Sequence, residues 1–236
     1  MEVHAHNHTE RKKFTHYLWE FLMLFLAVFS GFLAENQREH MVEHQREKQY
    51  IRSLVNDIKS DIKQLEKIDQ DWSGNVDAAD TAVKHLAGKE IYANSRLALY
   101  FVYGAMGFTD FISNDGTIQQ LKNSGGMRLI RKSKIVDSIM AYQKTVDIAT
   151  IHQAFMGDMM QSKNRVTDLF DMIHIINSKG NENIPLLTQD RKAINSAYTY
   201  ILEWGGLCKL LKGIGNDIKE CGKRLLKMIY EQYGIK

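Results

Sequence analysis

The sequence predicts an all-α protein in which an N-terminal transmembrane helix continues into a helical stalk and an antiparallel helical bundle. The scarcity of proline is the first indication. The 236 residues contain only Pro185, where average usage of ~5% would give roughly a dozen. Because proline interrupts helices and is frequent in turns, this scarcity favours long helices. Apolar residues also recur at helical spacing along several segments, and no alternating run of strand length occurs.

Composition and charge exclude several classes of protein. Hydrophobic residues make up 44% of the chain and charged residues 25%, which is typical of globular proteins and not of disordered or collagen-like ones. Two cysteines cannot form a disulfide framework. The 31 basic and 28 acidic residues leave a net charge of only +3, so we expect no nucleic-acid partner.

Residues 17–34 (YLWEFLMLFLAVFSGFLA) are the predicted transmembrane helix, and residues 1–16 form a His-rich leader before it. As a helix the segment extends about 27 Å, close to a hydrocarbon core of ~30 Å. Tyr17 and Trp19 lie at its start, where interfacial aromatic residues are typical. Two alternatives are a buried core helix and a cleavable signal peptide. Phe32, at position −3 from Ala34, disfavours cleavage.

Two features of this segment suggest roles beyond anchoring. Ala27 and Gly31 are four residues apart, as are Ser30 and Ala34, which lets helices approach closely and predicts a homo-oligomer. Glu20 is an ionisable residue one turn inside the segment and is a candidate for an ion or proton path. The alternative is that Glu20 lies at headgroup depth and reaches water.

Residues 35–72 are the predicted stalk, because no proline or glycine occurs between residues 32 and 73. The part from 35 to 49 is almost wholly charged or polar, as in a solvated helix. From Ile51 to Trp72 apolar residues recur at helical spacing, which predicts a packing face in a bundle or a coiled coil. Residues 73–75 (SGN) predict the first break.

Residues 73–236 are the predicted bundle domain. We expect helices over about 76–86, 96–106, 117–123 and 133–178, a helix from about 190 to Gly205-Gly206, and a final helix from Leu207. The 4-3-4-3 apolar spacing of the final helix indicates antiparallel packing. Cys208 and Cys221 lie on it about 20 Å apart, beyond the disulfide limit of ~7 Å, so both are predicted to be free.

Histidines near the N-terminus are the candidate metal ligands. His4, His6 and His8 alternate along the leader and suit zinc or another divalent transition metal. His40 and His44 belong to HMVEH, which has the H-x-x-E-H pattern of inverted zinc peptidases. That motif lies in a charged stalk with no third ligand or apolar cleft specified nearby, so we predict no enzyme and no firm cofactor.

Two stretches carry a family resemblance. The opening (KKFTHYLWEFLMLFLAVFSGFLAENQREH, then EKQYIRSLVNDIKSDI) and residues 117–131 (TIQQLKNSGGMRLIR) resemble an uncharacterised family of bacterial single-span membrane proteins. Such proteins have an uncleaved N-terminal helix and a C-terminal all-helical domain. The resemblance implies a bilayer anchor in the bacterial inner membrane and supplies no catalytic residues.

These observations predict a membrane-anchored, non-enzymatic protein that oligomerises through its span and stalk. It would be a subunit of a cell-envelope assembly with a membrane or envelope protein as partner, or a ligand-sensing or scaffold protein. An oligomeric channel that uses Glu20 is the alternative. Basic residues flank both ends of the span in similar number. We expect a cytoplasmic N-terminus and a periplasmic C-terminal domain.

Overall fold

The protein is all-α, as predicted. A computed structural model describes residues 14–180 and 182–235. The only β-type pairing in these ranges is an isolated bridge between Phe170 and Leu186. The helices in chain order are α1 (Phe14–Ala87), the 3-10 helix η1 (Lys89–Tyr92), α2 (Arg96–Met106), α3 (Gly116–Asn123), the 3-10 helix η2 (Gly126–Leu129), α4 (Ser133–Met160), α5 (Asn164–Thr167), α6 (Met172–Asn177) and α7 (Arg191–Tyr233).

The chain divides into two compact units, Met1–Gln49 and Tyr50–Lys236. In the first unit, every side chain from residue 14 to residue 41 is exposed. The helix there is long and apolar enough to cross a membrane, and none of its most apolar stretch is buried. Such exposure of phenylalanine and leucine does not fit the alternative of a buried core helix, because a core helix covers its apolar side chains.

The predicted helix break at residues 73–75 is wrong, because α1 continues to Ala87. Glycine inside a helix costs only about 1 kcal/mol relative to alanine, and the core includes an apolar residue on each side of Gly74. Trp72 and Ala79 are 2% and 1% exposed. Residues 50–72, predicted as stalk, therefore share the core of the second unit, whose boundary lies at residue 50 and not at residue 73.

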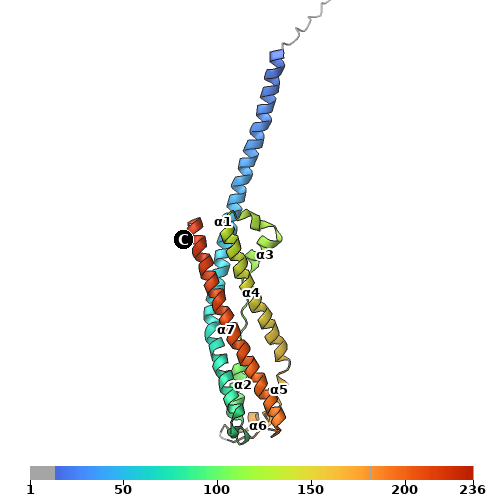
Figure 1. The fold of residues 1–236 in the computed structure, drawn as a ribbon, viewed down its shortest axis with the longest axis vertical. Coiled ribbons are helices and arrows are strands. Elements are labelled where there is room, and N and C mark those ends of the chain that lie inside the picture. The colour runs from blue at the N-terminus through green and yellow to red at the C-terminus, as the bar shows by residue number, and fades with distance from the viewer. Residues whose placement is uncertain (1–13, 181, 236) are drawn as a thin grey trace, which may run out of the picture. The chain divides into compact units, whose positions relative to one another are not determined.

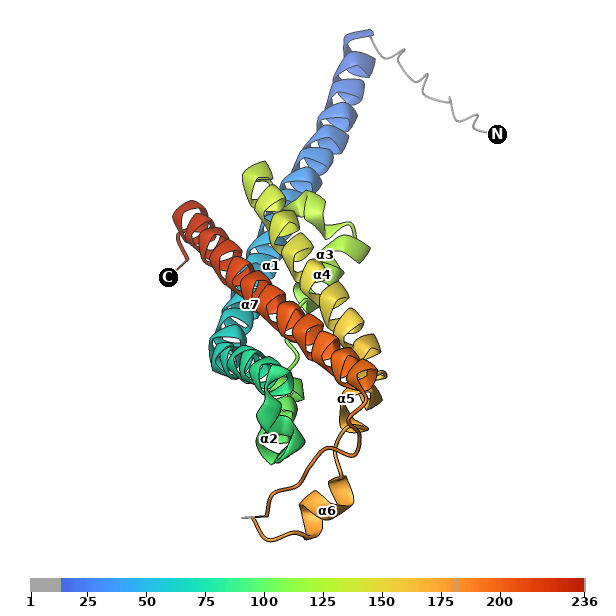
Figure 2. The same ribbon diagram turned by 60° about the horizontal axis from the view of Figure 1, so that its bottom comes forward.

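The core of the second unit lies among three long helices: α1 from residue 50 onward, α4 and α7. The hydroxyl of Tyr200 on α7 donates to the carbonyl of Met159 at the end of α4, 3.1 Å away. At the other end, Ser138 on α4 contacts Met228 on α7. These pairs run in opposite directions along the chain, so α4 and α7 are antiparallel, and Figures 1 and 2 show them side by side. The predicted antiparallel bundle is confirmed.

Helix α7 is continuous, so the predicted break at Gly205-Gly206 is wrong. Three of its glycines, Gly205, Gly215 and Gly222, serve close packing. A methyl group at Gly205 would lie 2.8 Å from Cβ of Ala79, and one at Gly222 would lie 3.1 Å from Cγ2 of Ile58. Helix α1 can approach α7 closely at these points because no side chain stands between them. The order of the contacts also makes α7 antiparallel to α1.

Helix α4 ends at Met160 and not at residue 178 as predicted. The chain continues through α5 and α6 into a loop that Figure 2 shows before α7. Asp171 caps α6 by accepting the backbone N–H of His174 at 2.9 Å. Leu187 donates its backbone N–H to the carbonyl of Leu169, also at 2.9 Å, which ties the loop back to the segment after α5. The apolar spacing indicated one helix over residues 133–178. The chain instead forms α4 and two short helices, and the cap of α6 and this backbone hydrogen bond stabilise the segment after α4.

Candidate functional site

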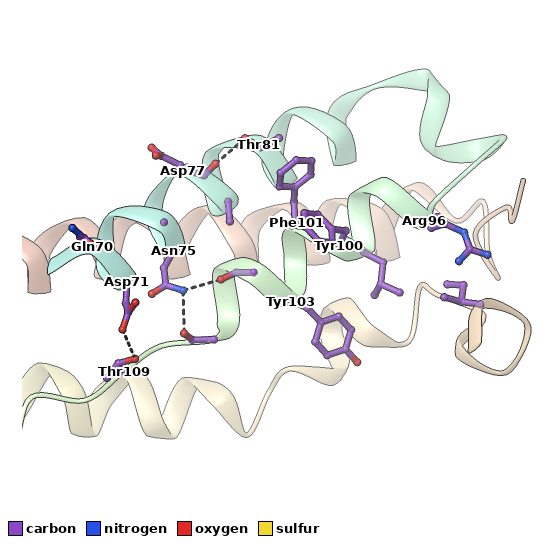
Figure 3. A pocket seen from close by; sticks show the side chains of 16 residues that line it. Gln70, Asp71, Asn75, Asp77, Thr81, Arg96, Tyr100, Phe101, Tyr103 and Thr109 are labelled. Carbon is purple, nitrogen blue, oxygen red and sulfur yellow. Dashed lines mark hydrogen bonds between the residues drawn. The ribbon is translucent and has the colours of Figure 1, made fainter. Parts of the chain in front are cut away.

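An open groove lies between the last turns of α1 and helix α2 in the second unit (Figure 3), with a cavity volume of about 1030 Å³. Because residues three and four apart share a face of a helix, Gln70, Gly74, Asp77 and Thr81 form one wall from α1. Tyr100, Tyr103 and Gly104 belong to the wall from α2. One wall is therefore mainly polar and the other mainly aromatic.

Asn75 fastens the C-terminal end of α2 to α1. Its side-chain amide donates to the carbonyls of Gly104 and Gly107 at 2.7 and 3.1 Å. Carbonyl groups at a helix C-terminus lack partners within the helix, so an amide NH₂ group is well suited to satisfy them. The contact fixes where α2 ends and where the loop toward α3 begins.

Trp72 and Asp71 hold the loop that follows α2. The Trp72 indole N–H donates to the carbonyl of Thr109 at 2.7 Å, and its ring stacks on Phe108 with centroids 5.5 Å apart. The Thr109 hydroxyl donates to the Asp71 carboxylate at 3.3 Å. Side chains of α1 therefore close this end of the groove, because they form hydrogen bonds with backbone and side-chain atoms of the loop.

Asn75 leaves a buried polar atom without a partner. Both groups that receive its N–H bonds are carbonyl oxygens, so the NH₂ group must face them and Oδ1 must point elsewhere. The residue is 5% exposed, and Oδ1 is buried with no donor among the described residues. The Nε of Arg96, at the opposite end of the groove, is likewise buried without an acceptor in the described parts of the chain.

The two ends of the groove carry opposite charges. Arg96 is the first residue of α2, where the helix dipole is positive, and its guanidinium also donates to the hydroxyl of Ser178. Asp71 lies by the loop that follows α2, near the end where the helix dipole is negative. Figure 3 shows Arg96 at one end of the drawn residues and Asp71 at the other.

The predicted helix over residues 96–106 does not by itself predict this groove, because a helical pattern does not show which side of the helix is covered. Helix α2 is buried on one side only, where Leu99 and Val102 are 6% and 0% exposed. On the other side Tyr100 is 71% exposed and Tyr103 is 51% exposed. The signal available in the sequence was the spacing of Arg96, Tyr100 and Tyr103, which places three amphipathic side chains on one helical face.

A second polar cluster surrounds Asp61 in the core. Asp61 is 1% exposed and accepts the backbone N–H and the side-chain amide of Asn114 at 2.7 and 2.8 Å, and the hydroxyl of Tyr142 at 2.7 Å. Burial raises the pKa of Asp61 above its usual range despite these hydrogen bonds, and burial beside the carboxylate raises the pKa of Tyr142. The cluster joins α1, α4 and the loop before α3. The sequence feature that could have indicated this cluster is the position of Asp61. It follows Ile58 by three residues and so lies on the apolar face of the helix.

Glu20 contacts His16, with 3.1 Å between Oε1 and Nε2, and both side chains are about half exposed. This arrangement fits the alternative in which the carboxylate reaches water near the start of the span. The small-residue face of Ala27, Ser30, Gly31 and Ala34 is exposed, and a methyl group at Gly31 would meet nothing within 4 Å. The ion path and the homo-oligomer both stay predictions.

The histidines of the HMVEH motif each face a glutamate on their own helix. His40 Nδ1 lies 3.9 Å from Glu43 Oε2, and His44 Nδ1 lies 3.2 Å from Glu47 Oε2. Residues 14–180 and 182–235 contain no group of three or more histidine, cysteine or acidic side chains placed to hold a metal ion. The leader histidines fall outside the described residues; they are His4, His6 and His8. Metal binding stays a prediction.

The two cysteines are free, as predicted. Cys208 is fully buried, and burial raises the pKa of its thiol to about 12. Cys221 is half-buried, with its Sγ 3.0 Å from the guanidinium of Arg224. Neither lines the groove.

Comparison with known proteins finds no family model, no curated protein and no solved structure that matches this chain. The groove and the apolar N-terminal helix are therefore the two features that bear on function.

Proposed function

We propose that this protein is a single-span, non-enzymatic membrane protein whose second unit binds an elongated small ligand in the α1–α2 groove. It would act as a ligand-sensing domain held at the membrane. The observation that carries the proposal is the groove itself, where the exposed rings of Tyr100 and Tyr103 line a cavity of about 1030 Å³. Ligand sites are typically concave, largely apolar and supplied with a few polar groups, and this groove has each property.

The Thr81 hydroxyl supports binding rather than catalysis. It donates to the backbone carbonyl of Asp77 at 2.7 Å. A nucleophilic hydroxyl needs a neighbouring general base that takes its proton, and a backbone carbonyl cannot do so. Thr81 therefore suits a residue that shapes the wall of the groove.

The apolar helix of the first unit supports anchoring in a bilayer. We place the protein in the bacterial inner membrane with a cytoplasmic N-terminus, so that the groove faces the periplasm. A ligand bound there would alter how the second unit engages a membrane or envelope partner. The short basic run at residues 11–13 is the basis for this orientation.

The groove can be blocked without disturbing the core. Gly74 lines the groove, and a Cβ atom added there meets nothing within 4 Å. Gly74→Phe therefore fills the groove with an aromatic ring. Gly213 on α7 offers a matched control, because it is exposed, has the same open surroundings and does not line the groove.

The test is calorimetric titration of the full-length protein in lipid nanodiscs with three probes of similar length: decanoate, decylamine and 10-aminodecanoate. We expect at least one probe to bind the wild type and the Gly213→Phe variant with 1:1 stoichiometry. Gly74→Phe should weaken that binding by tenfold or more. Equal binding of a probe to the wild type and both variants would refute the proposal. So would the absence of saturable binding by these three probes and by the pentapeptide Leu-Ser-Leu-Ser-Leu.

A further inference from the structure

We infer that the ligand of the groove is a short peptide bound in an extended conformation. Its free amino end would lie toward Asp71 and Asn75, and its free carboxyl end would lie toward Arg96. This inference rests on the proposed function, since it assigns a chemical class to the ligand of the same groove.

The electrical polarity of the groove selects a ligand with opposite charges at its two ends. The Asp71 carboxylate, the C-terminal end of α2 and the Asn75 oxygen all favour a cationic hydrogen-bond donor. At the other end, Arg96 and the N-terminal end of α2 favour an anionic acceptor. A peptide with free termini carries an ammonium group and a carboxylate in this arrangement.

The distance between the ends of the groove sets the length of the peptide. Arg96 and Gly107 are eleven residues apart, which corresponds to about 16 Å along a helix at a rise of 1.5 Å per residue. An extended chain covers ~3.3–3.6 Å per residue, so about five residues reach from one end to the other. An amino acid or a dipeptide is too short to reach both ends.

The two buried atoms without partners match the peptide termini. The Asn75 Oδ1 atom requires a donor, and an ammonium group offers three. The Arg96 Nε–H group requires an acceptor, and a carboxylate accepts from a guanidinium with favourable geometry. Both atoms belong to residues that line the groove, Asn75 near one end and Arg96 at the other.

The walls of the groove indicate which side chains the peptide carries. Successive residues of an extended chain point to opposite sides. One set would face the exposed rings of Tyr100 and Tyr103. The other would face the α1 wall with Gln70, Asp77 and Thr81. A peptide of alternating apolar and small polar residues fits both walls, so Leu-Ser-Leu-Ser-Leu is the probe of choice.

The test compares four forms of this pentapeptide by calorimetric titration of the full-length protein in nanodiscs. The forms have free ends, an acetylated amino end, an amidated carboxyl end, or both modifications. We expect the free form to bind, and each modification to weaken its affinity by tenfold or more. Gly74→Phe should abolish binding, and Gly213→Phe should not.

Charge-removal variants then assign each terminus to its end of the groove. In Asp71→Asn, acetylation of the amino end should no longer matter, whereas amidation should still weaken binding. In Arg96→Gln, amidation of the carboxyl end should no longer matter, whereas acetylation of the amino end should still weaken binding. Arg96→Lys should retain part of the sensitivity to amidation. Asp137→Asn, at an exposed position on α4 outside the groove, should behave as the wild type.

The outcomes separate this inference from the proposed function. If the four peptide forms bind equally, or if none binds while an amphiphilic probe binds in a Gly74-dependent manner, the peptide assignment is overturned and the groove remains a ligand site. If neither peptides nor amphiphiles bind, both are overturned. The peptide comparison on the wild type needs no variant, so a folding defect in Arg96→Gln does not affect it.

Discussion

A methyl group at Gly215 on α7 would lie only 2.5 Å from Cζ3 of Trp72 on α1. The indole ring of Trp72 therefore packs directly on the backbone of α7. The same ring is 2% exposed, and its N–H holds the loop that closes one end of the groove. This one glycine links the packing of the bundle to the shape of the groove.

Gly215→Ala should destabilise the protein by ~1–3 kcal/mol, because the added methyl forces the Trp72 ring or α7 to move. Gly213→Ala is the matched control. Its methyl meets nothing within 4 Å, and the higher helix propensity of alanine should raise stability by ~0.5–1 kcal/mol. Chemical unfolding of the full-length protein in one detergent measures both. Equal stability of the two variants would contradict the close packing described for Trp72.

Asp61 should make stability depend on pH. Its pKa is raised in the folded protein, so the folded state holds the proton more tightly than the unfolded state does. This contribution is fully present below about pH 3.8, the usual value for the group, and is lost as pH rises through the raised pKa. The wild type should therefore gain stability relative to Asp61→Asn as pH falls from 7 toward 4, by at most ~1.4 kcal/mol per pH unit.

Asn is a suitable replacement because its Oδ1 can still accept from Asn114 and its NH₂ group can donate to the Tyr142 hydroxyl. Asp57, whose carboxylate accepts the backbone N–H of Thr117 nearby, remains in both proteins and cancels in the comparison. Unfolding curves at several pH values provide the measurement. A difference between wild type and variant that stays constant from pH 4 to 7 would rule out titration of Asp61 in this range.

The two thiols should react at different rates. Cys208 is fully buried with a pKa of about 12, so very little thiolate forms at pH 8, and the reagent cannot reach it. Cys221 is half-buried and accessible. Alkylation of the native protein, followed by mass spectrometry, should modify Cys221 first and Cys208 only after unfolding. Simultaneous modification of both thiols in the folded protein would contradict the burial of Cys208.

The apolar N-terminal helix should keep the protein in the membrane fraction after an alkaline wash. Replacing both Leu24 and Val28 by arginine should release it, because each central arginine opposes insertion by ~2.5–3.5 kcal/mol. Ile151→Arg, at a residue of the second unit that is 66% exposed, is the control and should stay in the membrane fraction. Release of that control, or retention of the double variant, would show that another part of the chain determines membrane association.

The limits of two short helices could be predicted from the sequence. Helix α2 was expected at 96–106 and α3 at 117–123, and both are present within one residue of those limits. Here the apolar segments are short and turn residues bound them, so local preferences and tertiary packing agree. The predicted breaks at Gly74 and Gly205 were wrong for different reasons. Gly205 has no room for a side chain, since an added Cβ would lie 2.8 Å from Cβ of Ala79, whereas Gly74 is open and stays helical because Trp72 and Ala79 of the same helix are buried.

The sequence by itself determined the helical class, the apolar N-terminal helix and the free cysteines. Each follows from composition, from the length of an apolar run or from a separation along one helix. Only the tertiary structure decided that α1 and α7 continue through their glycines, that α4 ends at Met160, which side of α2 is exposed, and that Arg96 and Asp71 lie at opposite ends of one groove. These features depend on contacts between residues distant in the chain, such as Asn75 with Gly104 and Gly215 with Trp72. A periodic pattern shows that a helix has a face to bury, but not which helix will cover it.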